Sequence, residues 1–237
     1  MFFPFYDSTY ILVLIGVIVS MMASAKLNAT YQRYSAVRSM CGLTGAEAAK
    51  RLLNSQGIYD VTIRRVPGSL TDHYDPRDNT IYLSESVYGA PTIAAVGVAA
   101  HEAGHAVQYA LGYGPVRLRT AILPLTQIGS KFSFLLLFAG MLLYSQAMFL
   151  AGIILFSLTT FFQLVTLPVE FNASHRALET LESQSLLWDD ELVGARRVLR
   201  AAAMTYVAAL LMSALQLLRF VLIFAGRNNR EQGGGRQ

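Results

Sequence analysis

Charged residues are scarce in this sequence. Asp, Glu, Lys and Arg make up 14% of the 237 residues, and hydrophobic residues make up 54%. Soluble proteins carry roughly 25% charged residues. A water-soluble fold of this length could not bury so much apolar surface, so we expect a lipid bilayer to surround part of the chain.

Other scarcities exclude further classes of protein. Cys41 is the single cysteine, which rules out an internal disulfide. The net charge of +4 is spread along the chain and forms no compact basic stripe, so no nucleic-acid partner is expected. The first seven residues contain no Lys or Arg. The apolar N-terminus therefore reads as a retained membrane anchor and not as a cleaved signal peptide.

Long hydrophobic runs are abundant, and a membrane-spanning helix needs about 20 residues. We predict an N-terminal transmembrane helix within 1–25 and a helical hairpin over 128–167, in which Ser145 and Gln146 form the turn. A fourth hydrophobic helix is expected over 204–226. This last stretch contains Arg219, and a cation within a span is costly unless it reaches an interface or faces protein.

The segment 26–119 has mixed composition and predicts a small α+β domain. Thr44, with Glu47 three residues later, is typical of a helix start, and Gly57 would end that helix. The other elements expected here are a strand within YDVTIRRVPG, a strand over 80–84 and a buried helix from Pro91 to Gly112. The fold class is thus an α+β membrane protein that is mostly α-helical, with about four hydrophobic helices.

The C-terminal part is expected to contain a polar helix over 168–200 and a disordered tail over 227–237. Basic residues concentrate in the two long connecting segments, which places both on the cytoplasmic side. The arginine-bearing tail then falls outside, against that rule. Arg196, Arg197 and Arg200 suit an anionic cytoplasmic leaflet better than a nucleotide.

The run VAAHEAGHAVQYALG, 98–112, contains His101-Glu102-Ala103-Gly104-His105. Residues four apart share one face of a helix, so His101 and His105 can bind the same ion. Glu102 lies about 100° around the helix from His101, where it would act as a base for a metal-activated water. The alternative is a polar patch on a partly buried helix, with the histidines satisfied by neighbouring carbonyls, but a buried and uncompensated glutamate would be costly. Zinc suits two imidazoles and a carboxylate.

A catalytic zinc usually has three protein ligands and leaves one position for water. The best candidate for the third ligand is Glu170 in LPVEFNASHRALE, because the predicted hairpin returns the chain to the membrane face that carries the zinc helix. The alternative is an acidic residue that only compensates a helix dipole. His175 is the rival ligand, or would instead stabilise an oxyanion, and His73 is a further candidate.

HEAGH, VEFNASHRA and LTDHYDPRDNTIYLS together resemble the YugP-type membrane zinc metallopeptidases of bacteria, and the resemblance extends over most of the chain. It implies a zincin-like domain, one Zn²⁺ per chain and a multi-pass protein of the bacterial cell membrane. More distantly, Glu170-Phe171-Asn172-Ala173-Ser174 is similar to the Glu-x-x-Ala-Asp pattern of the HtpX and CAAX-prenyl-protease gluzincins. Ser174 stands at the aspartate position and would brace a ligand histidine through its outer ring nitrogen.

Substrate binding is expected before the zinc helix. In related metallopeptidases an edge strand pairs with an extended peptide, a role that the strand of Thr80, Ile81, Tyr82 and Leu83 would fill by its position in the sequence. A strand that only completes the sheet is the alternative. The neighbouring polar residues, His73, Tyr74, Asp75 and Arg77, are more typical of a turn than of a catalytic cluster.

The sequence therefore predicts a membrane zinc metallopeptidase that acts on a protein or peptide near the cytoplasmic face, with Glu102 as general base. A non-proteolytic scaffold, in which zinc holds the small domain, is the alternative. A transporter component is disfavoured because the spans carry few ionisable residues. No residue pattern identifies protein partners.

Overall fold

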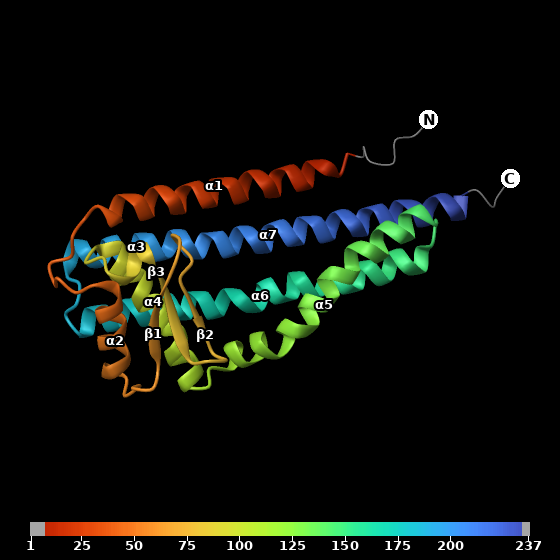
Figure 1. Ribbon diagram of the computed structural model, residues 1–237. Coiled ribbons are helices and arrows are strands. Elements are labelled where there is room, and N and C mark those ends of the chain that lie inside the picture. The colour runs from red at the N-terminus through yellow and green to blue at the C-terminus, as the bar shows by residue number, and fades with distance from the viewer. Residues whose placement is uncertain (1–7, 234–237) are drawn as a thin grey trace. The chain divides into compact units, whose positions relative to one another are not determined.

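Seven helices and three strands make up residues 8–233, the part of the chain that the computed structural model describes (Figure 1). The helices are α1 (Tyr10–Ser35), α2 (Gly45–Ser55), α3 (Glu85–Tyr88), α4 (Ile93–Ala110), α5 (Gly114–Leu142), α6 (Gln146–Ser183) and α7 (Asp189–Gly233). The strands are β1 (Thr62–Val66), β2 (His73–Asp75) and β3 (Thr80–Ser84).

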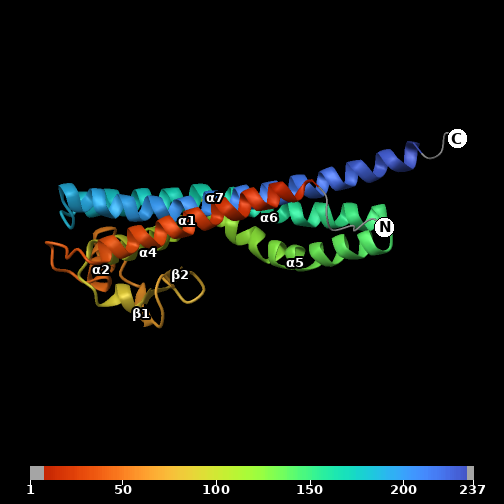
Figure 2. The same cartoon turned by 90° about the horizontal axis from the view of Figure 1, so that it is seen from above.

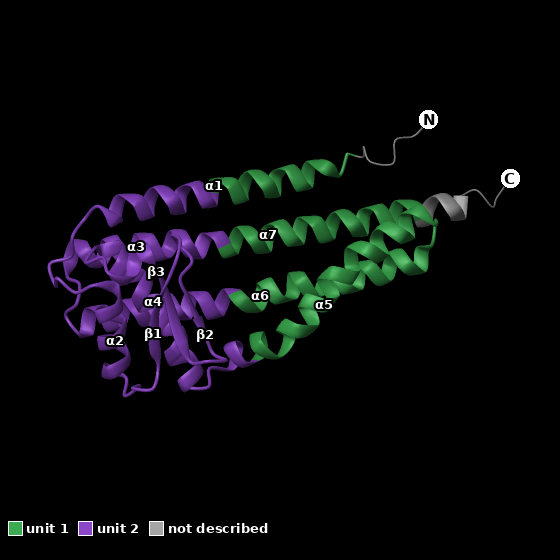
Figure 3. Ribbon diagram, viewed as in Figure 1, with its two compact units in different colours: residues 1–22, 118–166, 206–237 green, residues 23–117, 167–205 purple. Residues whose placement is uncertain are grey.

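The chain divides into two compact units (Figure 3). Unit 1 contains residues 1–22, 118–166 and 206–237, and unit 2 contains residues 23–117 and 167–205. The long helices α1, α5, α6 and α7 each contribute residues to both units. The three strands and α4, the helix that contains His101 and His105, belong to unit 2.

Four helices, α1, α5, α6 and α7, are long and apolar enough to cross a membrane. Between 6% and 28% of the most apolar window of each helix is buried, so most of these side chains need an apolar solvent. The prediction of about four hydrophobic helices is confirmed.

Helix boundaries differ from the prediction in the second half of the chain. A separate helix over 168–200 was expected, but α6 runs unbroken through Pro168, and the break comes at 184–188. A change in hydropathy marks a change of surroundings and need not end a helix, and proline is tolerated in membrane helices. Likewise α7 continues to Gly233, so the first part of the expected disordered tail is helical, and 234–237 lie outside the described residues.

In unit 1 the hairpin α5–α6 packs against α7 through an aromatic core. The buried members of this core are Leu137, Phe149, Ile153, Phe156 and Phe220.

The guanidinium carbon of Arg219 lies 3.9 Å from the centre of the Tyr10 ring, which is a cation–π geometry. The apolar stretch therefore carries its cation against an aromatic side chain of α1.

In unit 2 the strand order is β1-β3-β2, with β1 parallel and β2 antiparallel to β3. Both predicted strands are present, but β3 is not the edge strand expected at Thr80–Leu83; a role of these residues in substrate binding stays a prediction. β3 is the central strand and is hydrogen-bonded on both sides, and Thr80, Ile81 and Leu83 are buried. Sequence position alone did not reveal how the strands pair.

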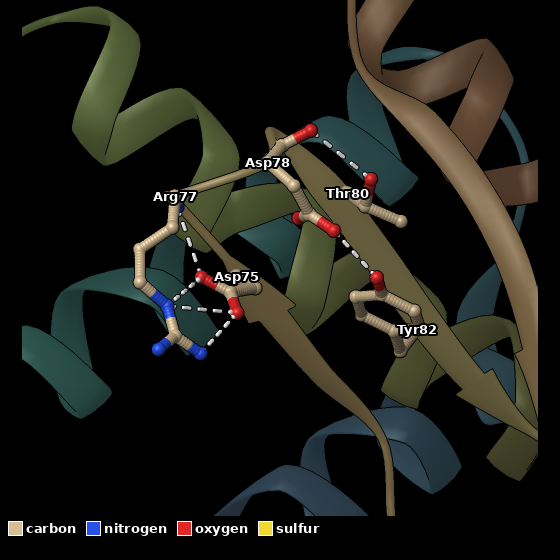
Figure 4. Close-up of polar contacts among 5 residues, drawn as sticks. All are labelled: Asp75, Arg77, Asp78, Thr80 and Tyr82. Atoms are coloured by element: carbon tan, nitrogen blue, oxygen red, sulfur yellow. Dashed lines mark hydrogen bonds and ion pairs between the residues drawn. The ribbon is translucent and has the colours of Figure 1, made fainter.

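The connection between β2 and β3 is a polar turn (Figure 4). The guanidinium of Arg77 binds the Asp75 carboxylate at 2.6 Å, and the Tyr82 hydroxyl donates to Asp78. The hydrogen bonds from the Arg77 side chain and backbone hold the pKa of Asp75 at about 2. The polar residues of this region thus hold a turn, as the sequence indicated.

Helix α4 lies between the sheet and the parts of α6 and α7 that belong to unit 2 (Figure 2). Its first turn is capped by the Thr92 side chain, which accepts from Ala95 N, and α2 begins with the predicted capping box of Thr44 and Glu47. Most α4 side chains are buried, which explains why this helix is apolar nearly all round.

Candidate metal centre

His101 and His105 lie one turn apart on α4, and both face Glu170 of α6. Their Nε2 atoms are 3.3 Å and 3.5 Å from Glu170 Oε2, and all three ligand atoms lie within 4.8 Å of one another. Tetrahedral zinc with bonds of about 2.0–2.1 Å places its ligand atoms roughly 3.4 Å apart. The two distances from the imidazoles to Glu170 match this separation, so the three side chains are candidates to hold one zinc ion.

A glycine allows the two helices to approach this closely. A Cβ atom built on Gly104 would lie 2.6 Å from the carbonyl oxygen of Ala173. Gly104 stands between Glu102 and His105, and Ala173 lies three residues after Glu170. The small residue inside HEAGH thus allows α6 to place its carboxylate against the imidazoles.

Glu102 is buried beside the two histidines and does not belong to the three-ligand cluster. Burial raises the pKa of Glu102, while the neighbouring histidine charges act in the opposite direction. For His105, burial lowers the pKa, but the hydrogen bond and the negative charge of Glu170 outweigh it and raise the pKa. A buried carboxyl group with a raised pKa is suited to accept a proton during catalysis.

The outer nitrogen of each imidazole also has a partner. Ser174 Oγ lies 3.1 Å from Nδ1 of His101, the contact expected from the sequence. Gln108 Oε1 lies 3.0 Å from Nδ1 of His105, a contact that the sequence analysis missed. Its signal in the sequence is weak: Gln108 lies three residues after His105, on the same side of the helix.

Residues 9–225 match the family described as "Putative neutral zinc metallopeptidase". The chain belongs to this family. A curated relative from Bacillus subtilis (strain 168), "Putative membrane protease YugP", is 47% identical over 214 residues, which cover 90% of this chain and 94% of the relative. No solved structure matches.

The family description agrees with the donor set on α4 and α6, and the YugP-type resemblance is confirmed. The more distant likeness to the HtpX gluzincins stays a prediction. The family name implies zinc, and His101, His105 and Glu170 are the residues that would hold it.

Two histidines considered as ligands lie elsewhere in the described part of the chain. His175 is exposed on α6, and its Nε2 lies 3.2 Å from Oε1 of the equally exposed Glu179. His73 is exposed on β2, where it stacks on the Tyr82 ring and contacts the Thr71 carbonyl. Neither side chain joins the three-ligand cluster, so the structure favours Glu170 over both rivals.

Proposed function

We propose that this protein is a membrane-embedded zinc endopeptidase that hydrolyses peptide bonds in protein or peptide substrates. The observation that carries the proposal is the convergence of His101, His105 and the buried Glu170 on one point, with the Glu102 carboxyl beside it. Membership of the zinc metallopeptidase family supports the same chemistry.

One zinc ion held by His101, His105 and Glu170 would supply Lewis-acid activation of water and of the scissile carbonyl. Glu102 accepts the proton of the attacking water and delivers it to the nitrogen of the leaving amine. Its burial excludes bulk water that would compete for this proton. The outer-nitrogen contacts of the two histidines hold both imidazoles with Nε2 toward Glu170, where they would bind the metal.

The ligand count favours an enzyme over a zinc-stabilised scaffold. A purely structural zinc site is normally closed by four protein ligands, whereas a catalytic site keeps a position for water. Three histidine or carboxylate ligands converge here, and the neighbouring carboxyl of Glu102 is not among them. A scaffold would have no use for a buried base at this position.

The four apolar helices and the distribution of basic residues support a proposal on membrane placement. We propose that unit 2, which contains the metal cluster, lies on the cytoplasmic face of a bacterial cell membrane. The substrates would then be proteins or peptides that reach this face.

Peptide hydrolysis by the purified, detergent-solubilised protein tests the proposal. A mixed library of unstructured peptides should be cleaved at internal bonds by the zinc-loaded protein, and a chelator should abolish cleavage until zinc is returned. A protein that binds zinc and cleaves nothing across such a library would instead support the scaffold.

A further inference from the structure

Gln108 connects the two helices that carry the candidate zinc ligands. The side chain is fully buried. Its Oε1 lies 3.0 Å from Nδ1 of His105 on α4, and its Nε2 donates to the Val169 carbonyl at 2.8 Å and to Asn172 Oδ1 at 3.0 Å, both on α6. All polar atoms of the amide are thus used, and all within unit 2.

The donor and the acceptor of each hydrogen bond around Gln108 can be assigned from the groups involved. Arg176 Nε lies 2.8 Å from the Asn172 side chain and can only donate, so the Asn172 atom facing it is the carbonyl oxygen. That oxygen and the Val169 carbonyl can only accept. The Gln108 atom between them is therefore the NH₂ group, and the opposite atom of Gln108 is its carbonyl oxygen.

The same reasoning assigns the ring hydrogen of His105, a candidate metal ligand. A carbonyl oxygen of Gln108 can only accept, so Nδ1 of His105 carries the hydrogen. In neutral imidazole the lone pair is then on Nε2, the atom that faces Glu170. We propose that Gln108 is a positioning residue that holds His105 in this tautomer, and that Asn172 and Arg176 fix the orientation of Gln108. The inference rests on the proposed zinc centre.

Val169, Asn172 and Arg176 differ in how much each contributes to the orientation of the Gln108 amide. The Val169 carbonyl is a backbone acceptor for the Gln108 NH₂ group, and no side-chain substitution removes it. Asn172 adds a second acceptor, and Arg176 acts only through Asn172. Loss of Gln108 should therefore weaken zinc binding most, and loss of Arg176 least.

The first test compares zinc affinity by competition with a fluorescent chelator. Gln108→Met keeps the length and apolar packing of the side chain but removes both donors and the amide acceptor. We expect a loss of roughly 10–100-fold in zinc affinity with an unchanged circular dichroism spectrum. A folded Gln108→Met protein with wild-type zinc affinity would overturn the inference.

Two variants of Asn172 test the same proposal if Gln108→Met does not fold. Asn172→Asp still offers two acceptors to Gln108 and Arg176, whereas Asn172→Leu offers none. We expect near wild-type zinc affinity for Asn172→Asp and weaker binding for Asn172→Leu. Equal zinc affinities of these two variants would contradict the proposal that Asn172 orients Gln108.

A third measurement reads the tautomer itself without any metal. Nitrogen-15 spectra of histidine-labelled, metal-free protein, recorded where imidazole is neutral, should show His105 protonated on Nδ1. The opposite tautomer would overturn the inference even if the protein binds zinc and cleaves peptides. A wild-type protein that binds no zinc would overturn the proposed function instead, and the spectrum would still decide the tautomer.

Discussion

At the scale of single residues, the site depends on carboxyl groups that differ in what they contact. Glu170 is 2% exposed and has both ligand imidazoles within 3.5 Å of one oxygen. Glu102 is also buried but lies outside the cluster of ligand atoms. Glu179, on the same helix as Glu170, is exposed and pairs with His175. These surroundings fit the roles proposed above, in which Glu170 binds the metal, Glu102 transfers protons and Glu179 does neither.

Replacement of Glu102 by Gln should separate catalysis from metal binding. The amide keeps the shape of the side chain but cannot accept the proton of water, so peptide hydrolysis should fall by roughly 10²–10⁴-fold. Zinc content, measured by elemental analysis, should stay at the wild-type value. Glu179→Gln is the matched control and should keep full activity. Hydrolysis at the wild-type rate in Glu102→Gln would remove Glu102 from the mechanism.

How much of the site the sequence predicts depends on the range of each contact. His101, Glu102 and His105 follow from local helical spacing, which needs no knowledge of the fold. Glu170 lies far along the chain, and its approach to the histidines was inferred from the hairpin. Gln108 was missed because a glutamine after a metal motif has no signature until its partners on another helix are known.

At the scale of elements, the candidate metal centre depends on the close contact between α4 and α6. Gly104 lets the Ala173 backbone approach, and Ala103 and Ala173 are fully buried nearby. Interiors this tightly packed tolerate added volume poorly.

Gly104→Ala should therefore push the two helices apart. Overpacking of this kind costs about 1–3 kcal/mol, so we expect a lower thermal midpoint together with weaker zinc binding. Gly114→Ala is the control, because a Cβ there meets nothing within 4 Å. A Gly104→Ala protein with wild-type stability and zinc affinity would show that this close approach does not matter.

The elements themselves were predicted unevenly from the sequence. The helix start at Thr44 was found because capping is local. The order of the strands was not, because β3 becomes central only through its long-range pairing with β1. The continuity of α6 was missed because its apolar part and its polar part were treated as separate helices.

At the scale of the whole molecule, the proposed topology predicts that the hairpin turn and the loop before α2 lie on opposite sides of the membrane. Each segment contains a well-exposed residue: Tyr144 in the hairpin turn is 83% exposed, and Met40 in the loop before α2 is 80% exposed. Cys41, the single cysteine, can be removed as Cys41→Ser to leave a background without thiols.

A membrane-impermeant thiol reagent applied to intact bacterial cells should label Tyr144→Cys in that background but not Met40→Cys. After lysis both variants should be labelled, because their exposure is similar. Labelling of Met40→Cys in intact cells would reverse the orientation and place unit 2 outside.

The central claim is that Glu170 completes a zinc site with His101 and His105. Its most direct test is the zinc content of purified, detergent-solubilised protein, with Glu170→Ala beside wild type and Glu179→Ala as the control. We expect one zinc per chain in the wild type and in the control, and loss or marked weakening of binding in Glu170→Ala. Zinc retained at full affinity in Glu170→Ala, or absent from the wild type after reconstitution, would contradict the account.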